Sequence, residues 1–205
     1  MNKVAPTKAN LMKSKSMLSF SKKGYDLLDR KRNVLIREVM GLVSRAENIQ
    51  AQIEQIFKEA YESLQYANII IGTNVVKELS SSISKGEDYD VLLQSVMGVE
   101  IPKIRYERKP VQPSYGLFRT NATFDNALLK FDEVKYLVYE LAEIETAVYK
   151  LAMEIKKTQK RANGLDKIQI PKYTEIVKDI ENALEEKERE DFFRLKKVKA
   201  KTKSK

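Results

Sequence analysis

Apolar residues recur every seven positions over two long stretches of this chain, one toward each end of the sequence. In the first stretch, one series begins at Leu11 and ends at Ala67. A second series, three positions later in the sequence, begins at Ser14 and ends at Ile70. In the second stretch, apolar residues alternate steps of three and four from Val134 onward until Leu165. Spacing of this kind over more than three heptads indicates a coiled coil rather than helices in a compact core. A single chain with two such arms folds back on itself most simply as an antiparallel pair.

The side chains expected where the two arms meet are mostly large and aliphatic, and their role would be to stiffen the pair. These seam residues are Leu28, Leu35, Leu42, Ile49, Ile56, Leu137, Leu141, Ile144, Val148, Leu151 and Ile155. Arg32 is the one charged residue in the seam of the first arm. The sequence therefore predicts a mainly all-α fold, a long antiparallel two-helix coiled coil with a small irregular head.

The middle of the chain, residues 72–121, holds most of the glycines and prolines and interrupts the heptad pattern. Within this head we expect short helices over 75–83 and 88–96. A strand over 99–107 would pair with 115–120 across a proline-rich turn to give a short β-hairpin. The expected division is an N-terminal coiled-coil arm (1–71), the head (72–121), a C-terminal arm (122–198) and a basic tail (199–205).

The second arm contains a proline inside its helical pattern. Pro171 cannot donate a backbone hydrogen bond and disfavours helical geometry in the residue before it. After Pro171 the apolar pattern restarts in a shifted phase at Ile176 and Ile180, a slip of the stutter kind. We therefore predict a kink or break between residues 165 and 172, and alignment of the two arms would place it opposite the region near Arg32.

Basic residues are concentrated at the two ends of the chain. The net charge is +9, and residues 1–32 carry nine basic and two acidic residues, whereas residues 194–205 carry seven basic residues and no acidic one. In an antiparallel pair both blocks would lie at one tip, either as a solvated tail or as a surface drawn to an acidic environment. The tip residues are Lys8, Lys13, Lys15, Lys22, Lys23, Arg194, Lys196 and Lys197.

Several kinds of chemistry are excluded by composition. The chain has no cysteine and no histidine, so it has no disulfide, no thiolate or imidazole metal site and no histidine base. Its glycines complete neither a phosphate-binding loop nor a dinucleotide fingerprint. We expect no catalytic, cofactor-binding or metal-binding residues. No signal peptide or membrane span is apparent, so we expect a soluble cytoplasmic protein, or one that reaches a membrane only through partners.

Several segments resemble the D subunit of the V/A-type rotary ATPases, and the resemblance extends over the whole chain. It begins with Pro6, Thr7 and Lys8 before Leu11 and is most specific in the last third. The remaining similar segments are residues 99–102, 115–116, 154–165, 168–171, 184–186, 188–190 and 194–199. Gly164 departs from the family pattern, where alanine is expected.

The resemblance implies a left-handed antiparallel coiled coil that acts as the central shaft of a rotary machine. Its tip would stand inside a hexamer of catalytic A and B subunits. Its middle region would dock on the C subunit (called d in eukaryotes) at the membrane side, and the small F subunit would bind along the shaft. Rotation would couple ATP hydrolysis or synthesis to proton or sodium transport, and the chain itself would be non-catalytic.

Two further groups of residues are candidates for partner contacts. Arg161 and Asn163, with Pro171, would contact the ring or else cap the local bend. The base contact would comprise Val99, Ile101, Tyr106, Tyr115 and Phe118, although these residues could instead only tie the arms together.

Two other classes of protein remain open from the residues alone. A free-standing basic coiled-coil tether would self-associate. A nucleic-acid-binding protein would fit the high isoelectric point, but aromatic residues for base stacking are scarce in the basic blocks.

Overall fold

The computed structural model describes residues 4–83, 89–108, 110–111 and 113–203. The chain divides into two compact units. Unit 1 combines Met1–Val34 with Ile155–Lys205, and unit 2 is Leu35–Glu154. Two long helical stretches supply most of both units, so the prediction of a mainly α-helical coiled-coil fold with a short hairpin is confirmed.

The first stretch is one helix, α1 (Lys8–Ile71). The Oγ1 of Thr7 accepts a hydrogen bond from the backbone N–H of Asn10 at 3.3 Å, the arrangement of a helix N-cap. The helix ends where Gly72 adopts a φ of +94°, which residues with a Cβ rarely reach. Between these ends, glutamate, lysine and glutamine on the exposed face favour helix over 64 residues.

The second stretch is helical throughout but changes its hydrogen-bond pattern once. It consists of α3 (Ala122–Gly164), a π-helical turn η2 (Leu165–Gln169) and α4 (Ile170–Lys203). The N–H of Ile170 donates to the carbonyl of Leu165, five residues back instead of four. The expected interruption between residues 165 and 172 thus takes the form of a wider turn within a continuous helix.

Unit 2 contains the head. Helix α2 (Thr73–Ser82) agrees with the helix expected over 75–83. Its buried Val76 and Leu79 pack with Ala67 of α1 and Phe124 of α3 in one apolar cluster. The head is therefore fastened to the ends of both long helices by its own small core.

A two-stranded antiparallel hairpin, β1 (Tyr89–Val96) and β2 (Val99–Tyr106), follows α2. The expectation of a helix over 88–96 is wrong for the described residues 89–96, because this apolar run pairs with β2. The expected partner for 99–107 is also wrong, since residues Leu117–Arg119 form a short 3₁₀ turn, η1. Met97 and Gly98 both have positive φ, so a tight two-residue turn joins neighbouring strands locally.

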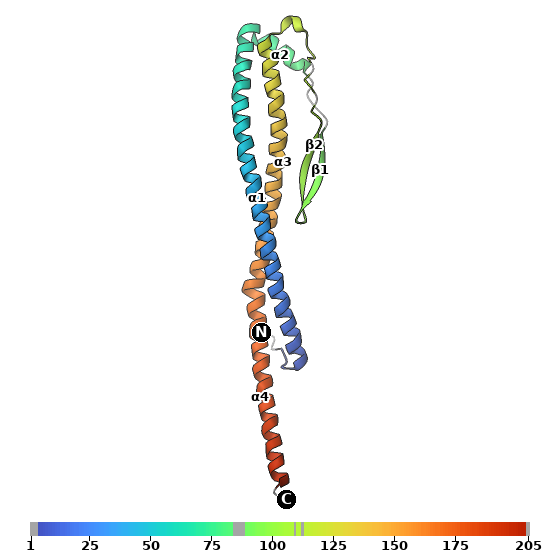
Figure 1. Cartoon of the computed structure of the whole chain (residues 1–205), viewed down its shortest axis with the longest axis vertical. Helices are drawn as coiled ribbons and strands as arrows, with labels where there is room; N and C mark the ends of the chain where they lie inside the picture. The colour runs from blue at the N-terminus through green and yellow to red at the C-terminus, as the bar shows by residue number, and fades with distance from the viewer. Residues whose placement is uncertain (1–3, 84–88, 109, 112, 204–205) are drawn as a thin grey trace. The chain divides into compact units, whose positions relative to one another are not determined.

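The hairpin lies beside α3 within unit 2 (Figure 1). The N–H of Ile104 donates to Oε2 of Glu143 at 2.8 Å. The ring of Tyr106 contacts the rings of Tyr136 and Tyr139, and Tyr89 also contacts Tyr139. These contacts hold the open end of the hairpin on α3, and the turn end projects away from them.

In unit 1 the two helical strands run antiparallel. Lys15 pairs with Glu181 at 2.6 Å, and Lys8, the first residue of α1, pairs with Glu188 at 3.4 Å. Helix α4 continues beyond this level, to Lys203 (Figure 1). The described side chains after Glu188 are exposed. In the described residues, no helix is long and apolar enough to cross a membrane.

Candidate functional site

The predicted seam residues lie on facing sides of the long helices within each unit, with different degrees of burial. Leu35, Ile49, Ile144 and Leu151 are buried. The half-buried ones are Leu42, Ile56, Leu137, Leu141 and Val148 in unit 2, with Leu28 and Ile155 in unit 1. Since apolar side chains fill the contact at heptad spacing, bending one helix would expose apolar area from both.

Ion pairs flank the seam in unit 2. Arg45 pairs with Glu140, and Lys130 pairs with Glu59 at 2.8 Å. The hydrogen bond and charge of Lys130 lower the pKa of Glu59, and the same contact raises the pKa of Lys130. Exposed pairs of this kind contribute little to stability, but they favour the antiparallel alignment of α1 with α3.

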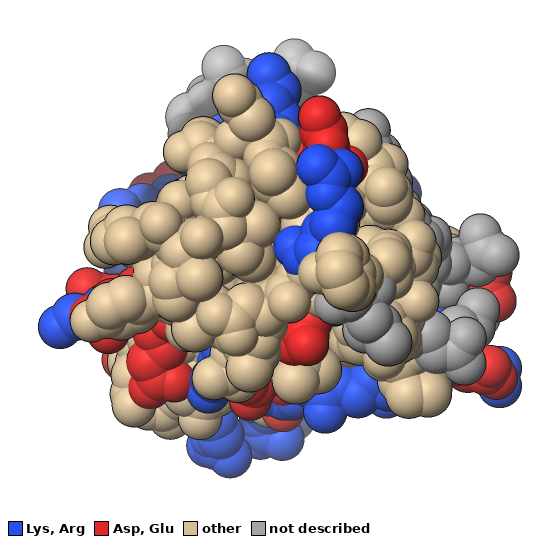
Figure 2. Space-filling view, turned by 90° about the horizontal axis from the view of Figure 1, so that it is seen from above, with Lys and Arg blue, Asp and Glu red and all other residues tan. Residues whose placement is uncertain are grey.

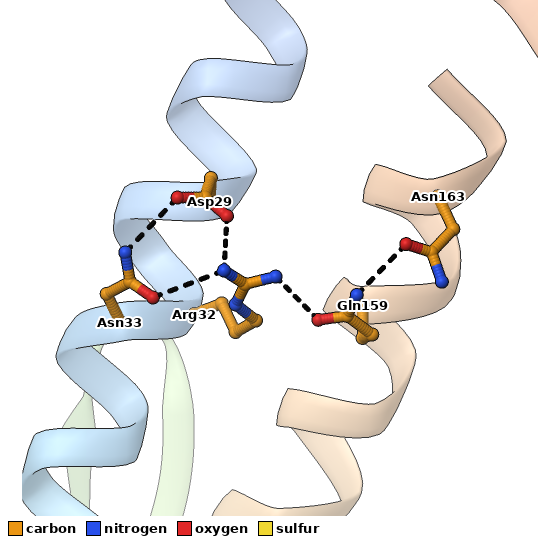
Figure 3. Close-up of polar contacts among 5 residues, drawn as sticks. All are labelled: Asp29, Arg32, Asn33, Gln159 and Asn163. Carbon is orange, nitrogen blue, oxygen red and sulfur yellow. Dashed lines mark hydrogen bonds and ion pairs between the residues drawn. The ribbon is translucent and has the colours of Figure 1, made fainter. Parts of the chain in front are cut away.

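A polar layer interrupts the seam in unit 1 (Figure 3). Nη1 of Arg32 donates to Oε1 of Gln159 at 2.7 Å across the two helices. On its own helix, Arg32 pairs with Asp29 and donates to Oδ1 of Asn33 at 3.3 Å. Gln159 in turn donates through Nε2 to Oδ1 of Asn163 at 2.9 Å. The single charged residue of the seam is thus fully engaged by side chains from both helices.

The polar layer and the π-turn lie opposite different positions along α1. Arg32 lies opposite Gln159, whereas a Cβ added to Gly24 would meet Cδ1 of Leu165 at 3.4 Å. The expectation that the interruption lies opposite Arg32 is therefore wrong by about two helical turns. The residue opposite the start of the π-turn is Gly24.

The π-turn preserves the seam through a change in sequence phase. Steps of three and four continued from Leu165 would bring Lys172 and Asp179 to the seam, and both are exposed. Instead Tyr173 and Ile180, each one position later, are half-buried and buried respectively. One extra residue in a π-turn accounts for this offset. Pro171 follows immediately, and the wider turn relieves the clash its ring would have in a regular helix.

The other predicted residues beside the interruption are exposed. Arg161 and Pro171 face solvent, and Asn163 is also exposed while it accepts the hydrogen bond from Gln159. Asn163 therefore belongs to the polar layer, whereas Arg161 projects outward on the same helix.

The basic residues predicted for the tip lie in unit 1, and all eight are exposed. Lys8 and Lys15 are ion-paired with α4, and Arg194 lies 3.6 Å from Glu190 and 3.7 Å from Asp191. The remaining five are Lys13, Lys22, Lys23, Lys196 and Lys197. Because α4 extends past the start of α1, the two basic blocks are staggered along unit 1 rather than level.

The residues predicted for the base contact fall into two places in unit 2. Val99, Ile101 and Tyr106 are half-buried in β2. Tyr115 and Phe118 lie instead near the beginning of α3. Phe118 is fully exposed, at 102% of its reference area. The five residues do not form one surface.

Tyr115 is anchored in the head. Its hydroxyl donates to Oδ1 of Asp125 at 2.6 Å, and its ring packs edge-on against Phe124. Burial, with the hydrogen bond and charge of Asp125, raises the pKa of Tyr115 to about 12. Tyr115 therefore acts as a structural tie between the η1 segment and α3.

Sequence reasoning missed an exposed apolar end of unit 2. Ile69 and Ile70, at the end of α1, are 79% and 59% exposed. Figure 2, which views the molecule from above, shows mainly uncharged surface crossed by a narrow row of charged side chains. Ile70 continues the heptad series, but the neighbouring Ile71, and not Ile70, packs against the apolar cluster that contains Ala67 and Phe124. The seven-residue spacing therefore does not give the buried face at the end of α1.

In the described part of the chain, no group of three or more acidic side chains is arranged to hold a metal ion. The structure offers paired helices in each unit, with basic and polar surfaces in unit 1 and an apolar surface in unit 2. These features define a coiled-coil protein with an inserted hairpin head. Comparison with known proteins identifies its family.

Residues 10–200 match the family model for the D subunit of ATP synthase, and the chain belongs to that family. It is 45% identical over 198 residues to the V-type ATP synthase D subunit of Thermotoga neapolitana, covering 97% of this chain and 98% of that protein. It is 36% identical over 201 residues to the A-type ATP synthase D subunit of Pyrococcus abyssi, covering 97% and 94%.

Proposed function

We propose that this chain is the central-stalk rotor subunit of a V/A-type rotary ATPase and that it is not itself catalytic. Family membership over nearly the full length is the observation that carries the proposal. The chain would transmit rotation between ATP hydrolysis or synthesis in a hexamer of A and B subunits and proton or sodium transport in the membrane.

The packing within each unit suits a mechanical role. A twisting load is resisted when the apolar faces of two helices stay in contact along their length. The seam of unit 2 provides such a contact through Leu35, Ile49, Ile144 and Leu151. In unit 1, the π-turn keeps apolar side chains at the contact after the phase shift. The scaffold is therefore suited to carry torque without an active site.

Three partner contacts are part of the proposal. The basic tip in unit 1 would enter the hexamer, with Arg161 facing its inner surface. The apolar end of unit 2, with Phe118, would meet the C subunit at the membrane side, and the small F subunit would bind along the shaft. The complex would work at the cytoplasmic face of the membrane, with this chain attached only through its partners.

A reversible cross-link tests whether the chain rotates. The sequence has no cysteine, so an Arg161→Cys change creates a unique thiol. In a reconstituted complex whose hexamer carries one facing cysteine, oxidation should abolish ATP turnover and a reductant should restore it. Arg161→Cys without the facing cysteine is the matched control. Full turnover with the cross-link formed would exclude a rotor and leave a static tether.

Charge neutralisation tests the tip. Replacing Lys8, Lys13, Lys15, Lys22 and Lys23 by glutamine should weaken binding to the hexamer, with a larger effect at low salt. Assembly that is indifferent to both charge and salt would overturn the electrostatic role of the tip. Binding to any polyanion in preference to the hexamer would instead favour the nucleic-acid alternative.

A further inference from the structure

The outer edge of β1 carries backbone groups that have no partner within the described part of the chain. The hydrogen-bond pattern of the hairpin identifies them. In an antiparallel pair, residues alternate between positions that bond to the partner strand and positions that point outward. The N–H of Ile104 donates to Glu143, so Ile104 and its partner Val91 occupy an outward-pointing position.

Two other features give the same alternation. Pro102, which has no N–H, is the partner of Leu93, two residues along from Val91. The two-residue turn at Met97 and Gly98 is closed by the bonded pair Val96 and Val99, as expected for a tight hairpin. Counting from either end, the outward-pointing residues of β1 are Tyr89, Val91, Leu93 and Ser95.

Within the described residues, most of the outer edge of β2 is unavailable to a further strand. On β2, the N–H of Ile104 is bonded to Glu143, and Pro102 has no donor. Tyr106 is covered by the rings of Tyr136 and Tyr139. The outer edge of β2 is therefore occupied at Ile104 and Tyr106 and lacks a donor at Pro102, whereas Glu100, beside the turn, is exposed. The longer free edge belongs to β1.

The edge of β1 lacks the devices that normally prevent strand pairing. Natural edge strands are blunted by lysine, proline, bulges or a covering helix. The charged residue of β1 is Asp90, near its beginning, and residues 91–97 contain neither proline nor a charged residue. Val91 and Leu93 are 55% and 63% exposed, and Leu92, on the opposite face, is 48% exposed. An apolar edge of this length attracts another strand unless it is covered.

We propose that the outer edge of β1 receives a strand from a different subunit of the assembled ATPase, which extends the hairpin to a three-stranded sheet. This inference rests on the proposed function, because it requires a complex that supplies the strand. Main-chain hydrogen bonds at Tyr89, Val91, Leu93 and Ser95 would hold the added strand, and its apolar side chains would cover Val91 and Leu93.

Charge favours a different subunit over a second copy of this chain. Each copy carries a net charge of +9, so two copies repel one another. On the face that holds Leu92, β2 adds the exposed side chains of Lys103 and Arg105. On the same face β1 carries the exposed Asp90, the partner of Arg105, so the net charge of this face is positive by one. The added strand is therefore expected to be apolar toward Val91 and Leu93, and acidic only on the part of the Leu92 face that lies nearest Lys103.

A backbone substitution separates main-chain docking from side-chain contact. Val91→Pro removes one outward N–H and leaves the bonds between β1 and β2 in place, as Pro102 already does on the other strand. Val91→Ala is the matched control, because it shortens the same side chain and keeps the N–H. In complexes reconstituted from purified subunits, Val91→Pro should weaken retention of the strand-donating subunit roughly fivefold relative to Val91→Ala.

Hydrogen exchange and cross-linking identify the contact. In the isolated chain, the amides of Leu92 and Gln94 should exchange slowly and those of Val91 and Leu93 rapidly. In the complex, the latter two should slow by about tenfold. A photoreactive amino acid in place of Leu93 should cross-link to an extended segment of another subunit.

Each other result overturns the inference. Equal retention of Val91→Pro and Val91→Ala, unchanged exchange at Val91 and Leu93, or cross-linking to a helix would exclude strand addition. Cross-linking between two copies of this chain would identify the wrong partner. If the unmodified chain fails to assemble at all, the proposed function fails; if it assembles and the variants behave alike, only the docking inference fails.

Discussion

Arg32 and Gln159, 127 positions apart in the sequence, are joined by a 2.7 Å hydrogen bond across the helix pair of unit 1. Asp29, Asn33 and Asn163 complete the layer. A guanidinium at a seam position loses hydration, and this loss is offset only while its partners stay in place. The layer therefore makes the contact sensitive to the removal of either residue alone.

We expect Arg32→Leu to lower the free energy of unfolding by about 1–3 kcal/mol, because it leaves the Gln159 amide without its cross-helix donor. The double change Arg32→Leu with Gln159→Leu should be less destabilising than the single change, since it removes both polar groups. Chemical denaturation measures both. Arg30→Leu, an exposed neighbour, is the matched control; a double variant less stable than the single one would contradict the account.

The one-residue phase shift can be tested by two identical substitutions. Ile180 is buried after the π-turn, whereas Ile168, within the turn, is 64% exposed. Ile180→Ala should cost about 2–4 kcal/mol. Ile168→Ala should change stability by no more than about 0.5 kcal/mol. Thermal unfolding provides the comparison, and equal losses would show that the π-turn does not set which face of α4 is buried.

Replacing Met97 should stabilise the hairpin turn. Met97 has a φ of +52° in the hairpin turn. This backbone conformation brings its Cβ close to the following carbonyl oxygen, which costs about 1 kcal/mol or more. Asparagine tolerates this region and is preferred before glycine in such turns. We expect Met97→Asn to slow exchange of the Val99 amide in the hairpin. Met97→Ala, which keeps the strain, should give no protection.

The hydroxyl of Tyr115 gives a pH-dependent contribution. Its pKa is raised to about 12 in the folded chain, against about 10 when unfolded. The contribution is therefore fully present below pH ~10 and is lost as the pH rises toward 12. Tyr115→Phe should cost about 1 kcal/mol at neutral pH. Its stability deficit relative to the unmodified chain should shrink between pH 10 and 12, as followed by denaturation at each pH.

The apolar end of unit 2 predicts a partner contact that folding does not require. Ile69→Ser and Phe118→Ser should each leave stability within about 0.5 kcal/mol, because both side chains are exposed. Each should weaken binding to the C subunit by about fivefold or more, measured by titration calorimetry. Leu129→Ser, at a position on α3 that is 55% exposed, is the control. Unchanged binding by both end variants would place the contact elsewhere.

The long helices were predictable because their signal is periodic and repeated many times along the chain. The hairpin was harder to predict. The turn contains Met97, which is not a typical turn residue, and the apolar run before it could equally be read as a helix. Pro171 marked the interruption. However, only coordinates could reveal that the backbone stays helical and that Gly24, rather than Arg32, lies opposite it.

The exposed surfaces were the least predictable part. Ile70 fits the heptad series, but the neighbouring Ile71 is the residue that packs against the apolar cluster of the head, and the period does not show this. Likewise, the apolar residues of β1 indicate that the segment pairs with another strand, but they do not show whether its second edge is also paired. Such surfaces depend on which elements are neighbours, and this depends on contacts between segments far apart in the sequence.

The π-turn has a consequence for insertions and deletions. Because Leu165–Gln169 holds one residue more than a regular helix needs, loss of a single codon there, combined with Pro171→Ala, would restore ordinary helix while leaving Tyr173 and Ile180 oriented as before. A one-codon loss elsewhere in the paired part of α3 or α4 would rotate everything beyond it by about 100°. The π-turn is thus a place where the chain can lose one residue without changing which faces of the two helices pack together in unit 1.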